Sequence, residues 1–390
     1  MSSTEPPRVA LTELGDLMQV GEPLPFKLLD SQGRLLLAAG QRVTNDRQLA
    51  ALLEREACVD QAEVQAVRQA RSAAGAGGLH VGARKPTWFE QMEQQVWGMD
   101  DLLRTMNREP APTLASRIEA FADEYIALVE RHFDAALFLV VRQQDRRFAL
   151  YALTHALHTA TVGLLAARQI GWSAAQQRHV VLAALTMNAS IVELQARMAE
   201  QTDPPTKKQL EQIRAHPKQS AQLLRDCGVA DADWLAAVED HHERSGGAGY
   251  PRGVAEVGDV AHLLRAADVF TAKISPRALR APLSPQLAAR QLFQEENGGP
   301  FAAAMIRAVG VYPPGDFVWL KNGEAGIVLF RAAPPRGTVV VAMIGANGKG
   351  VPGAPKRDTS LPEFAITGAL AERANLPRVL PEQVYGLLVA

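Results

Sequence analysis

The hydrophobic residues in the middle of the chain recur at intervals of three and four positions, the spacing that places them on one face of a helix. In residues 116–141 the recurring positions are Ile118, Phe121, Ala122, Tyr125, Leu128 and Val129. This pattern predicts one amphipathic helix over residues 116–141. Further helices are predicted over residues 148–169, 174–188, 206–225, 231–243, 258–274 and 284–293. We therefore expect helical structure between about residues 87 and 310.

Both ends of the chain instead show short apolar runs separated by turn residues, which is typical of β-hairpins. Near the start, two such runs flank residues 30–33 (DSQG), and a helix is predicted after them over residues 45–56. Near the end, Asn322-Gly323 separates two runs, and residues 338–344 add a third predicted strand. The pattern predicts a mainly α protein with a small N-terminal α+β module and a C-terminal β-rich appendage.

The length of 390 residues favours more than one domain, because single cores seldom grow that large. Residues 71–86 are rich in Gly and Ala and carry no apolar period, so they are predicted to form a linker or an exposed loop. We expect four parts: the N-terminal module at 1–80, a linker and helical lead-in at 81–144, a helical domain at 145–314 and the β-rich extension at 315–390.

Composition and charge limit the classes of partner. Lys and Arg number 41 against 42 for Asp and Glu, so no overall basic field attracts nucleic acid or an anionic membrane. The two cysteines, Cys58 and Cys227, form no zinc-type spacing and favour a reducing compartment. No secretory signal opens the sequence, and the longest strongly apolar run, residues 136–141, is far shorter than the ~20 residues of a membrane span. We expect a cytoplasmic protein with no membrane span and no nucleic-acid partner.

The residues most indicative of chemistry are His241 and His242 and the Gly-rich loop after them, HHERSGGAGYPRG. Trp234, Leu235 and Val238 place both histidines near the buried stripe of the preceding helix. Neutral imidazoles in an interior are good ligands for first-row metals, and glycines let backbone approach a ligand closely. A histidine pair alone is more simply explained by a capped helix and a turn, but this string of thirteen residues is far more specific.

The string resembles the signature of the HD-GYP family, HHE-R-x-D-G-x-G-Y-P-x-G, and departs from it only where Gly246 replaces aspartate. The family's other landmarks follow in order at His155, His216, Asp268, Arg277 and Arg280. They lie in the segments YALTHALHTATVG, IRAHPKQSAQLL and LLRAADVFTAKISPRALR. The resemblance covers about residues 145–330 and, more weakly, the N-terminal hairpin module.

This resemblance implies an HD-type helical phosphohydrolase bundle whose metal ligands are His155, His216, His241, His242 and Asp268. In the family, two or three iron or manganese ions lie between helices and activate a water that attacks a phosphodiester of cyclic di-GMP. Metal ions suit this reaction because they lower the pKa of the water and neutralise the phosphate.

The resemblance also implies ligand-binding positions. Gly249, Tyr250 and Pro251 form the loop that the family uses for signalling partners such as GGDEF-type cyclases. Four arginines are candidates for phosphate contacts: Arg244, Arg252, Arg277 and Arg280. A solvated surface position explains each of these arginines equally well.

The family's defining H-D-I-G-K motif is altered. Met187 stands for the histidine, Asn188 for the aspartate and Ile191 for the lysine. Thioether sulfur suits soft copper(I) rather than manganese or iron, and an amide lacks the negative charge that bridges two cations. Tyr151 fills the place where three-metal members carry a glutamate. We therefore expect at most one iron or manganese ion and no dinuclear centre.

The surviving candidate ligands also have structural explanations. His155 lies on an apolar helix face, where a buried structural histidine is as good an explanation as a ligand. His216 precedes Pro217 at a predicted helix break and could be a cap or a surface residue. Asp268 lies on a buried stripe and needs a partner, either an arginine or a metal. The remaining histidines without a motif are interpreted as structural: His158, His179 and His262.

Three functions stay open. The first is a bacterial signalling protein with a degenerate domain, impaired in catalysis, that binds cyclic di-GMP, a related phosphodiester, or a GGDEF-type or other protein. The second is an active metal-dependent cyclic di-GMP phosphodiesterase weakened by its altered site. The third is a structural scaffold that uses its β-rich flanks for assembly. Met187-Asn188 favours the first, and whether the chain is an enzyme remains open.

Overall fold

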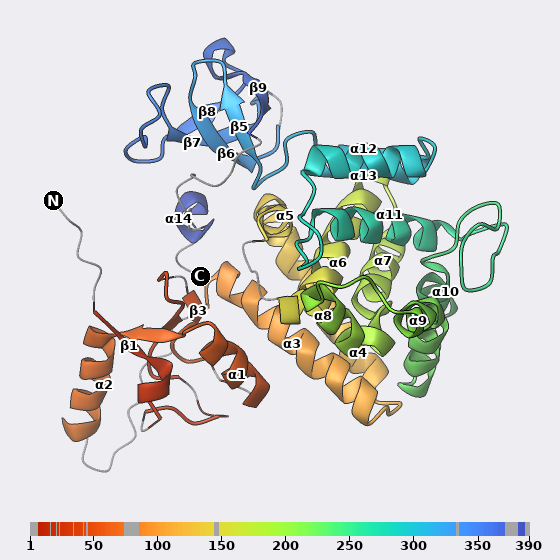
Figure 1. Ribbon diagram of the computed structural model, residues 1–390, viewed down its shortest axis with the longest axis horizontal. Coiled ribbons are helices and arrows are strands. Elements are labelled where there is room, and N and C mark those ends of the chain that lie inside the picture. Colours follow the sequence, from red (N-terminus) through yellow and green to blue (C-terminus); the bar gives the residue numbers. More distant parts are fainter. Residues whose placement is uncertain are drawn as a thin grey trace. The chain divides into compact units, whose positions relative to one another are not determined.

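The computed structural model describes residues 7–15, 17–20, 22, 24–33, 35–41, 43, 46–73, 86–143, 148–332, 335–370 and 381–386. The chain divides into two compact units, Met1–Trp97 with Gly386–Ala390, and Gly98–Tyr385. The second unit holds both the central helices and the C-terminal strands (Figure 1). It therefore contains all of the predicted site residues.

The first unit is built on a four-stranded antiparallel sheet in the order β1-β4-β2-β3. Its elements are β1 (Arg8–Ala10), η1 (Leu11–Glu13), β2 (Leu28–Leu29), β3 (Leu35–Leu37), α1 (Asp46–Glu54), β4 (Cys58–Asp60) and α2 (Gln61–Ala73). Strands β2 and β3 form the predicted hairpin, and its turn is closed where the Gly33 N–H donates to the Asp30 carbonyl over 2.8 Å. Residue 45 of the predicted helix and residues 74–85 of the predicted linker lie outside the described residues.

The bundle in the second unit is arranged around α6. Helix α3 (Trp88–Arg108) leads into this bundle. The helices after it are α4 (Leu114–Arg131), α5 (Phe133–Val141), α6 (Tyr151–Ile170), α7 (Ala174–Thr186), α8 (Val192–Glu200), α9 (Lys207–Asp226), α10 (Ala232–Asp240), α11 (Asp259–Ile274), α12 (Pro285–Glu295) and α13 (Pro300–Val309). Helix α6 packs against α7, α11 and α13, and it is buried on nearly every side. A helix that is apolar all round belongs in an interior, which is why this one forms the core.

The helix boundaries follow from local capping chemistry. Thr206 begins α9 by accepting the backbone N–H of Gln209, whose side chain accepts the Thr206 N–H in return. Ser173 and Gln176 form the same reciprocal pair at the start of α7. Such capping boxes satisfy N–H groups that a helix leaves free at its first turn.

The single helix predicted over residues 116–141 is wrong, because the chain forms α4 and α5 with a break at His132. His132 leaves the helical region with φ −147° and ψ 67°. The two helices also differ in character, since α4 buries one stripe while α5 is buried at six of its nine positions. The hydrophobic pattern therefore continues from α4 into α5 in the sequence, although the chain leaves the helical conformation between them.

The C-terminal strands form a five-stranded antiparallel sheet in the order β8-β7-β6-β5-β9. They are β5 (Phe317–Leu320), β6 (Ala325–Phe330), β7 (Val339–Ile344), β8 (Lys356–Asp358) and β9 (Ile366–Ala369). The short helix η4 (Pro362–Phe364) lies between β8 and β9, and α14 (Pro381–Tyr385) follows β9. The hairpin predicted at Asn322-Gly323 joins β5 to β6. One face of the sheet packs on Phe138 of α5, and Arg331 pairs with Asp134 over 2.5 Å. These contacts attach the sheet to the helical bundle.

One helical segment of the described residues, Ala174–Glu200, is long and apolar enough by composition to cross a membrane. Its most apolar window of 18 residues is 72% buried inside the protein, and the segment includes α7, η3 (Ala189–Ile191) and α8. A core helix passes the same test of length and composition, so this segment is weak evidence for a membrane span.

Candidate functional site

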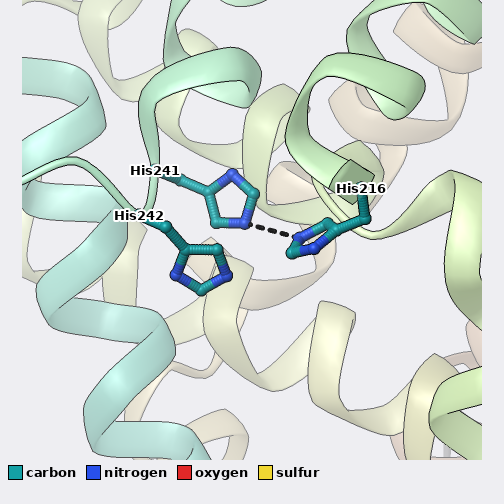
Figure 2. A group of neighbouring side chains, drawn as sticks. All are labelled: His216, His241 and His242. Carbon is teal, nitrogen blue, oxygen red and sulfur yellow. Dashed lines mark hydrogen bonds between the residues drawn. The ribbon is translucent and has the colours of Figure 1, made fainter. Parts of the chain in front are cut away.

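Three predicted ligands come together between α9 and the end of α10. His216 lies inside α9, while His241 and His242 directly follow α10 (Figure 2). One ring nitrogen from each of the three lies within 4.8 Å of the others. His216 and His241 are 1% and 0% exposed, so His216 is neither a surface residue nor a cap. This group, His216, His241 and His242, is called the histidine triad below.

Proline explains why His216 has its orientation. Helix α9 continues through Pro217, which has no N–H to donate to the carbonyl four residues earlier, that of Ile213. That carbonyl instead lies 2.5 Å from the Nδ1 atom of His216. The Nδ1 atom of His241 similarly lies 2.7 Å from the carbonyl of Val238, in the last turn of α10 where carbonyls lack helical partners. Both histidines are thus oriented by carbonyls that the helices leave free.

These two hydrogen bonds determine where the protons are. A carbonyl oxygen only accepts, so Nδ1 must carry the hydrogen in His216 and in His241. The Nε2 atom of each neutral ring then carries a lone pair and no hydrogen. The two Nε2 atoms face each other over 3.1 Å. Two acceptors at this distance repel, whereas two nitrogens bound to one cation are about 3 Å apart because each lies about 2.1 Å from the ion. The arrangement fits a shared positive ion.

The rings are held in their neutral form. Burial, and then the neighbouring His241, lowers the pKa of His216 to about 3. Burial also lowers the pKa of His241, and it lowers that of His242 to well below its ordinary value. At neutral pH the triad therefore offers the unprotonated imidazoles that first-row metals bind.

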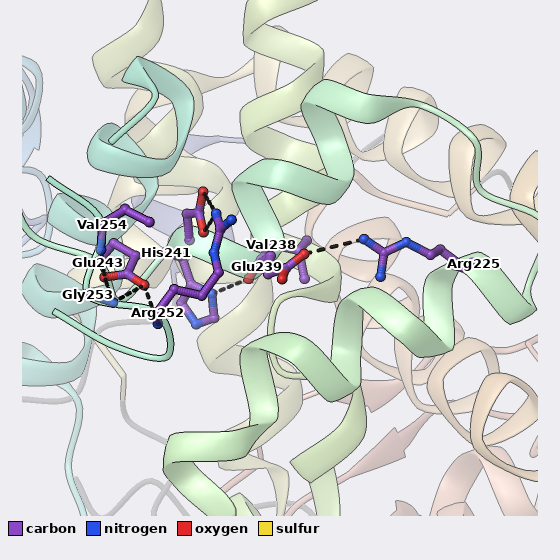
Figure 3. Close-up of polar contacts among 9 residues, drawn as sticks. Arg225, Val238, Glu239, His241, Glu243, Arg252, Gly253 and Val254 are labelled. Carbon is purple, nitrogen blue, oxygen red and sulfur yellow. Dashed lines mark hydrogen bonds and ion pairs between the residues drawn. The ribbon is translucent and has the colours of Figure 1, made fainter. Parts of the chain in front are cut away.

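The Gly-rich loop after the triad is folded around the carboxylate of Glu243, as Figure 3 shows. Glu243 is 1% exposed and accepts backbone N–H groups from Arg252, Gly253 and Val254 at 2.6 to 3.3 Å. Outside this turn, the guanidinium of Arg252 bonds both oxygens of Asp240 at 2.6 and 2.7 Å. The negative charge of Glu243 thus fixes a loop that has few side chains of its own.

Gly249 allows the close return of this loop. A Cβ atom at that position would lie 2.4 Å from the Arg244 nitrogen and 2.4 Å from the Glu243 Cα atom. The return places the ring of Tyr250 on that of His242, with centroids 4.6 Å apart and an angle of 27° between planes. Pro251 follows directly, so the predicted ligand-binding loop borders the triad. Gly246, which stands for the family's aspartate, has φ +87°.

The other two predicted ligands, His155 on α6 and Asp268 on α11, bond to each other instead. The Nε2 atom of His155 lies 2.7 Å from Oδ1 of Asp268. Burial alone would raise the pKa of Asp268, but the hydrogen bond and charge of His155, with help from His242 and His241, lower it well below its usual range. The partner expected for Asp268 was an arginine or a metal, and in this structure it is a histidine.

Tyr151 and Arg277 lie beside this pair. The Tyr151 ring stacks on His155, with centroids 5.2 Å apart and planes 11° from parallel. The guanidinium of Arg277 lies 4.6 Å from the centre of the Tyr151 ring and donates to its hydroxyl oxygen. Burial raises the pKa of Tyr151, although Arg277 opposes the shift, so the phenol keeps its proton. Among the described residues, Nε of Arg277 is buried and has no acceptor.

The altered H-D positions lie at the end of α7. Met187 is fully buried and Asn188, 8% exposed, directly precedes η3. The indole of Trp234 donates to Thr186 over 3.0 Å, which ties this segment to α10. The hydroxyls of Ser190 and Ser220 lie 2.9 Å apart and tie it to α9. The segment therefore keeps its place between the helices although its two ligand types have changed.

The remaining arginines differ in surroundings. Arg244 and Arg280 are exposed, and Arg280 donates to the Ala272 carbonyl over 2.6 Å. Arg265, one turn before Asp268, was not singled out from the sequence. It is 4% exposed and forms an ion pair with Glu296, whose other oxygen lies 2.9 Å from His262. Its position three residues before Asp268 on a buried stripe was the available signal.

The histidines interpreted as structural lie outside the triad. His179 lies 2.9 Å from Asp231, at the start of α10, and His262 belongs to the Arg265–Glu296 group. His158 lies one turn after His155, and burial lowers its pKa to about 3.

The chain is similar to known proteins, and a matching family model covers part of the helical region. Residues 143–299 match a family model described as HD domain. The chain is 30% identical over 213 residues to the cyclic di-GMP phosphodiesterase PA4108 of Pseudomonas aeruginosa, in an alignment that covers 53% of this chain and 50% of that protein. The chain thus spans about half the length of the curated relative it matches. Among solved structures, it is similar to Bd1817, an HDG"Y"P protein from Bdellovibrio bacteriovorus, with a TM-score of 0.48 and 14% identity over 78% of this chain and 98% of that chain.

Proposed function

The chain belongs to the HD superfamily as a protein of the HD-GYP type, and on that premise we propose that it is a signalling protein that binds cyclic di-GMP at a single-metal site. In this proposal the histidine triad holds one iron or manganese ion. Hydrolysis of the ligand is impaired, so the complex itself carries the signal.

The observation that carries the proposal is the approach of two imidazole nitrogens that are both acceptors. Nε2 of His216 and Nε2 of His241 face each other over 3.1 Å, and the carbonyls of Ile213 and Val238 occupy the opposite nitrogens. Only a positive charge between them makes this arrangement favourable. His242, stacked on Tyr250, supplies a third nitrogen to the same place.

The expectation of impaired hydrolysis comes from the charge at residue 188. Two cations side by side repel strongly unless an anionic oxygen lies between them. Asn188 offers a neutral amide in place of that oxygen, and Met187 offers a thioether that suits neither iron nor manganese. The pairing of His155 with Asp268 also uses two groups that a second ion would need.

Each part of the site has a role in ligand binding. The bound ion would neutralise phosphate charge and lower the pKa of a bound water. The loop of Gly249, Tyr250 and Pro251 presents backbone and an aromatic ring beside the triad. Arg244 adds an exposed guanidinium next to this loop, and guanidinium groups bind phosphate oxygens in pairs.

The test combines metal analysis with calorimetry on the full-length protein. Elemental analysis is expected to give about one ion per chain, and titration with cyclic di-GMP is expected to give saturable binding that chelator weakens. Chromatography of the ligand after incubation with manganese is expected to show it intact. Two ions per chain together with cleavage that chelator abolishes would overturn the proposal.

An active cyclic di-GMP phosphodiesterase is the second candidate, favoured by the likeness to PA4108. In that case the same chromatography would detect a linear dinucleotide or GMP. A scaffold without ligand is the third, and the absence of any heat at high micromolar cyclic di-GMP would favour it over both others.

A further inference from the structure

The segment that carries the altered motif positions is fixed through a single peptide group, the one between Ala189 and Ser190. The carbonyl of Ala189 accepts an N–H from the side chain of Asn107, on α3, over 2.9 Å. The N–H of Ser190 donates to Oγ of Ser220, on α9, over 3.2 Å. This peptide group, close to Asn188, is therefore bonded at both of its ends to helices from other parts of the sequence.

The hydrogens of the two serines have one consistent arrangement. The Oγ atom of Ser220 accepts the N–H of Ser190, and the two hydroxyl oxygens lie 2.9 Å apart. The hydroxyl of Ser190 also lies 3.2 Å from the carbonyl of His216, which only accepts, so Ser190 donates there. Its one hydrogen is then used, and Ser220 must donate to Oγ of Ser190. These three linked hydrogen bonds, which strengthen one another, are called the serine clamp below.

The serine clamp ends on the backbone of His216, at a turn of α9 that lacks a helical hydrogen bond. Pro217 has no N–H for the carbonyl of Ile213, so the helix is less well fixed here. The donation from Ser190 to the His216 carbonyl fixes this turn from outside the helix. A metal site depends on this, because ligand distances must be correct within about 0.2 Å. The Nε2 atom of His216 must also keep its place 3.1 Å from that of His241.

We infer that Ser190, Ser220 and Asn107 are positioning residues of the histidine triad. They fix the backbone of His216, so that its ring nitrogen meets the ion at bonding distance. The inference rests on the proposed function in one respect, namely that the triad is the metal site. Ser190 stands where the H-D-I-G-K motif has its glycine, and a glycine has no hydroxyl. The serine clamp thus fixes a segment in which the motif's own metal-binding side chains have been replaced.

The experiment compares Ser220→Ala, Ser190→Ala and Asn107→Ala with a rescue variant and a matched control. Ser190→Thr is the rescue variant, because it keeps the hydroxyl that the serine clamp needs. Thr161→Val is the control, because it removes a buried hydroxyl that is also bonded to a backbone carbonyl and to a second hydroxyl, at 3.1 and 2.7 Å. Each full-length variant is titrated by calorimetry with Mn²⁺ and, without air, with Fe²⁺. Thermal transitions in chelator are measured in parallel.

We expect Ser220→Ala and Ser190→Ala each to weaken binding of both ions about 10-fold, since contacts behind a metal ligand commonly contribute that much. Asn107→Ala should weaken it less, about 3-fold, because Asn107 is exposed and water can replace its hydrogen bond. Ser190→Thr and Thr161→Val should bind within about 2-fold of wild type, although Thr161→Val should lower the thermal transition. Wild-type affinity in both serine-to-alanine variants would overturn the inference, and so would an equal loss in Thr161→Val. If one variant fails to fold, the remaining ones decide.

A measurement without metal separates this inference from the proposed function. In chelator, the nitrogen chemical shifts of the His216 ring report its tautomer and its hydrogen bond, and they should change in Ser220→Ala but not in Thr161→Val. Wild-type protein that binds neither ion, together with this change in Ser220→Ala, would refute the metal site and support the positioning of His216. Wild-type protein that binds one ion, with affinity and ring shifts unaffected by Ser220→Ala, would do the reverse. Protein that shows neither binding nor the change would refute both.

Discussion

The two halves of the site contain similar residue types but differ in which ring nitrogens have hydrogen-bond partners. In the histidine triad, carbonyls hold the outer nitrogens of His216 and His241 and leave the inner nitrogens facing each other. In the other half, Nε2 of His155 bonds Asp268, Nδ1 of His155 has no partner among the described residues, and Tyr151 and Arg277 lie beside the pair. The first half therefore leaves two lone pairs pointing at one place, whereas the second half already pairs a carboxylate with an imidazole. Candidate ligands are therefore better judged by their remaining lone pairs than by residue type.

The largest effect is expected from His241→Ala, which removes one of the two facing nitrogens. We expect metal content to fall from about one ion per chain to near zero, and the thermal transition of the variant to become insensitive to chelator. His179→Ala is the matched control, because His179 pairs with Asp231 away from the triad. A variant that keeps its ion would show that the triad is not the metal site.

The double substitution Met187→His with Asn188→Asp is designed to let both halves of the site bind a metal ion. The new carboxylate supplies the bridging charge, so a second ion should compete with the His155–Asp268 hydrogen bond and raise the metal content toward two per chain. Met187→His alone is the control and should stay at one. A second ion in that control would mean that the charge at residue 188 does not limit metal binding.

Acid should destabilise the metal-free protein through the triad. The pKa of His216 is about 3 in the folded protein and about 6.5 when unfolded. Between these values the unfolded chain binds more protons, so stability falls as the pH falls from about 6.5 toward 3. His216 alone contributes a loss of about 2 kcal/mol at pH 5 relative to pH 7.

Denaturant unfolding in chelator, at pH 7, 6 and 5, measures this loss. His216→Gln should show a smaller decline than wild type, because one of the depressed pKa values is gone. Asp268 does not confuse the result, since its lowered pKa affects stability only below about pH 4. Equal declines in both proteins would mean that His216 is not the cause.

Pro217→Ala should have smaller effects, lowering the metal affinity while raising the stability of the metal-free protein. Residue 217 would gain an N–H that competes with His216 for the Ile213 carbonyl, so metal affinity should fall about 10-fold, as for other losses of a ligand's outer hydrogen bond. The metal-free protein should become more stable, because an interior proline weakens a helix. Pro285→Ala, at the first position of α12, is the control and should change neither quantity.

Periodicity and local motifs predicted most of the fold. The predicted helices over 174–188, 206–225, 258–274 and 284–293 correspond to α7, α9, α11 and α12, because each has a continuous apolar stripe and clear ends. The hairpins at residues 30–33 and Asn322-Gly323 formed for the same local reasons. Strands β8 and β9 were missed because they are short, partly exposed edges without an alternating pattern.

The site was only partly accessible from the sequence. The resemblance identified His216, His241 and His242, and the structure brings these together. Nothing in the sequence reveals that His155 and Asp268 bond to each other, or that Arg277 reaches Tyr151, because these contacts span 113 and 126 positions. Such pairings depend on how α6 and α11 pack, and that is decided by the whole core.

The ligands of the triad come from neighbouring parts of the chain. His216 and His241 are 25 residues apart, one within α9 and the other directly after α10, and these two consecutive helices pack together. A bound ion would therefore act as a cross-link that closes one short loop, and the entropy it removes from the unfolded chain grows only slowly with loop length. Metal release should loosen α9 and α10 against each other while α6 and α11 keep their contacts. Loss of the ion would then increase local opening of the hairpin formed by α9 and α10. Amide hydrogen exchange should become faster in these two helices before it does elsewhere.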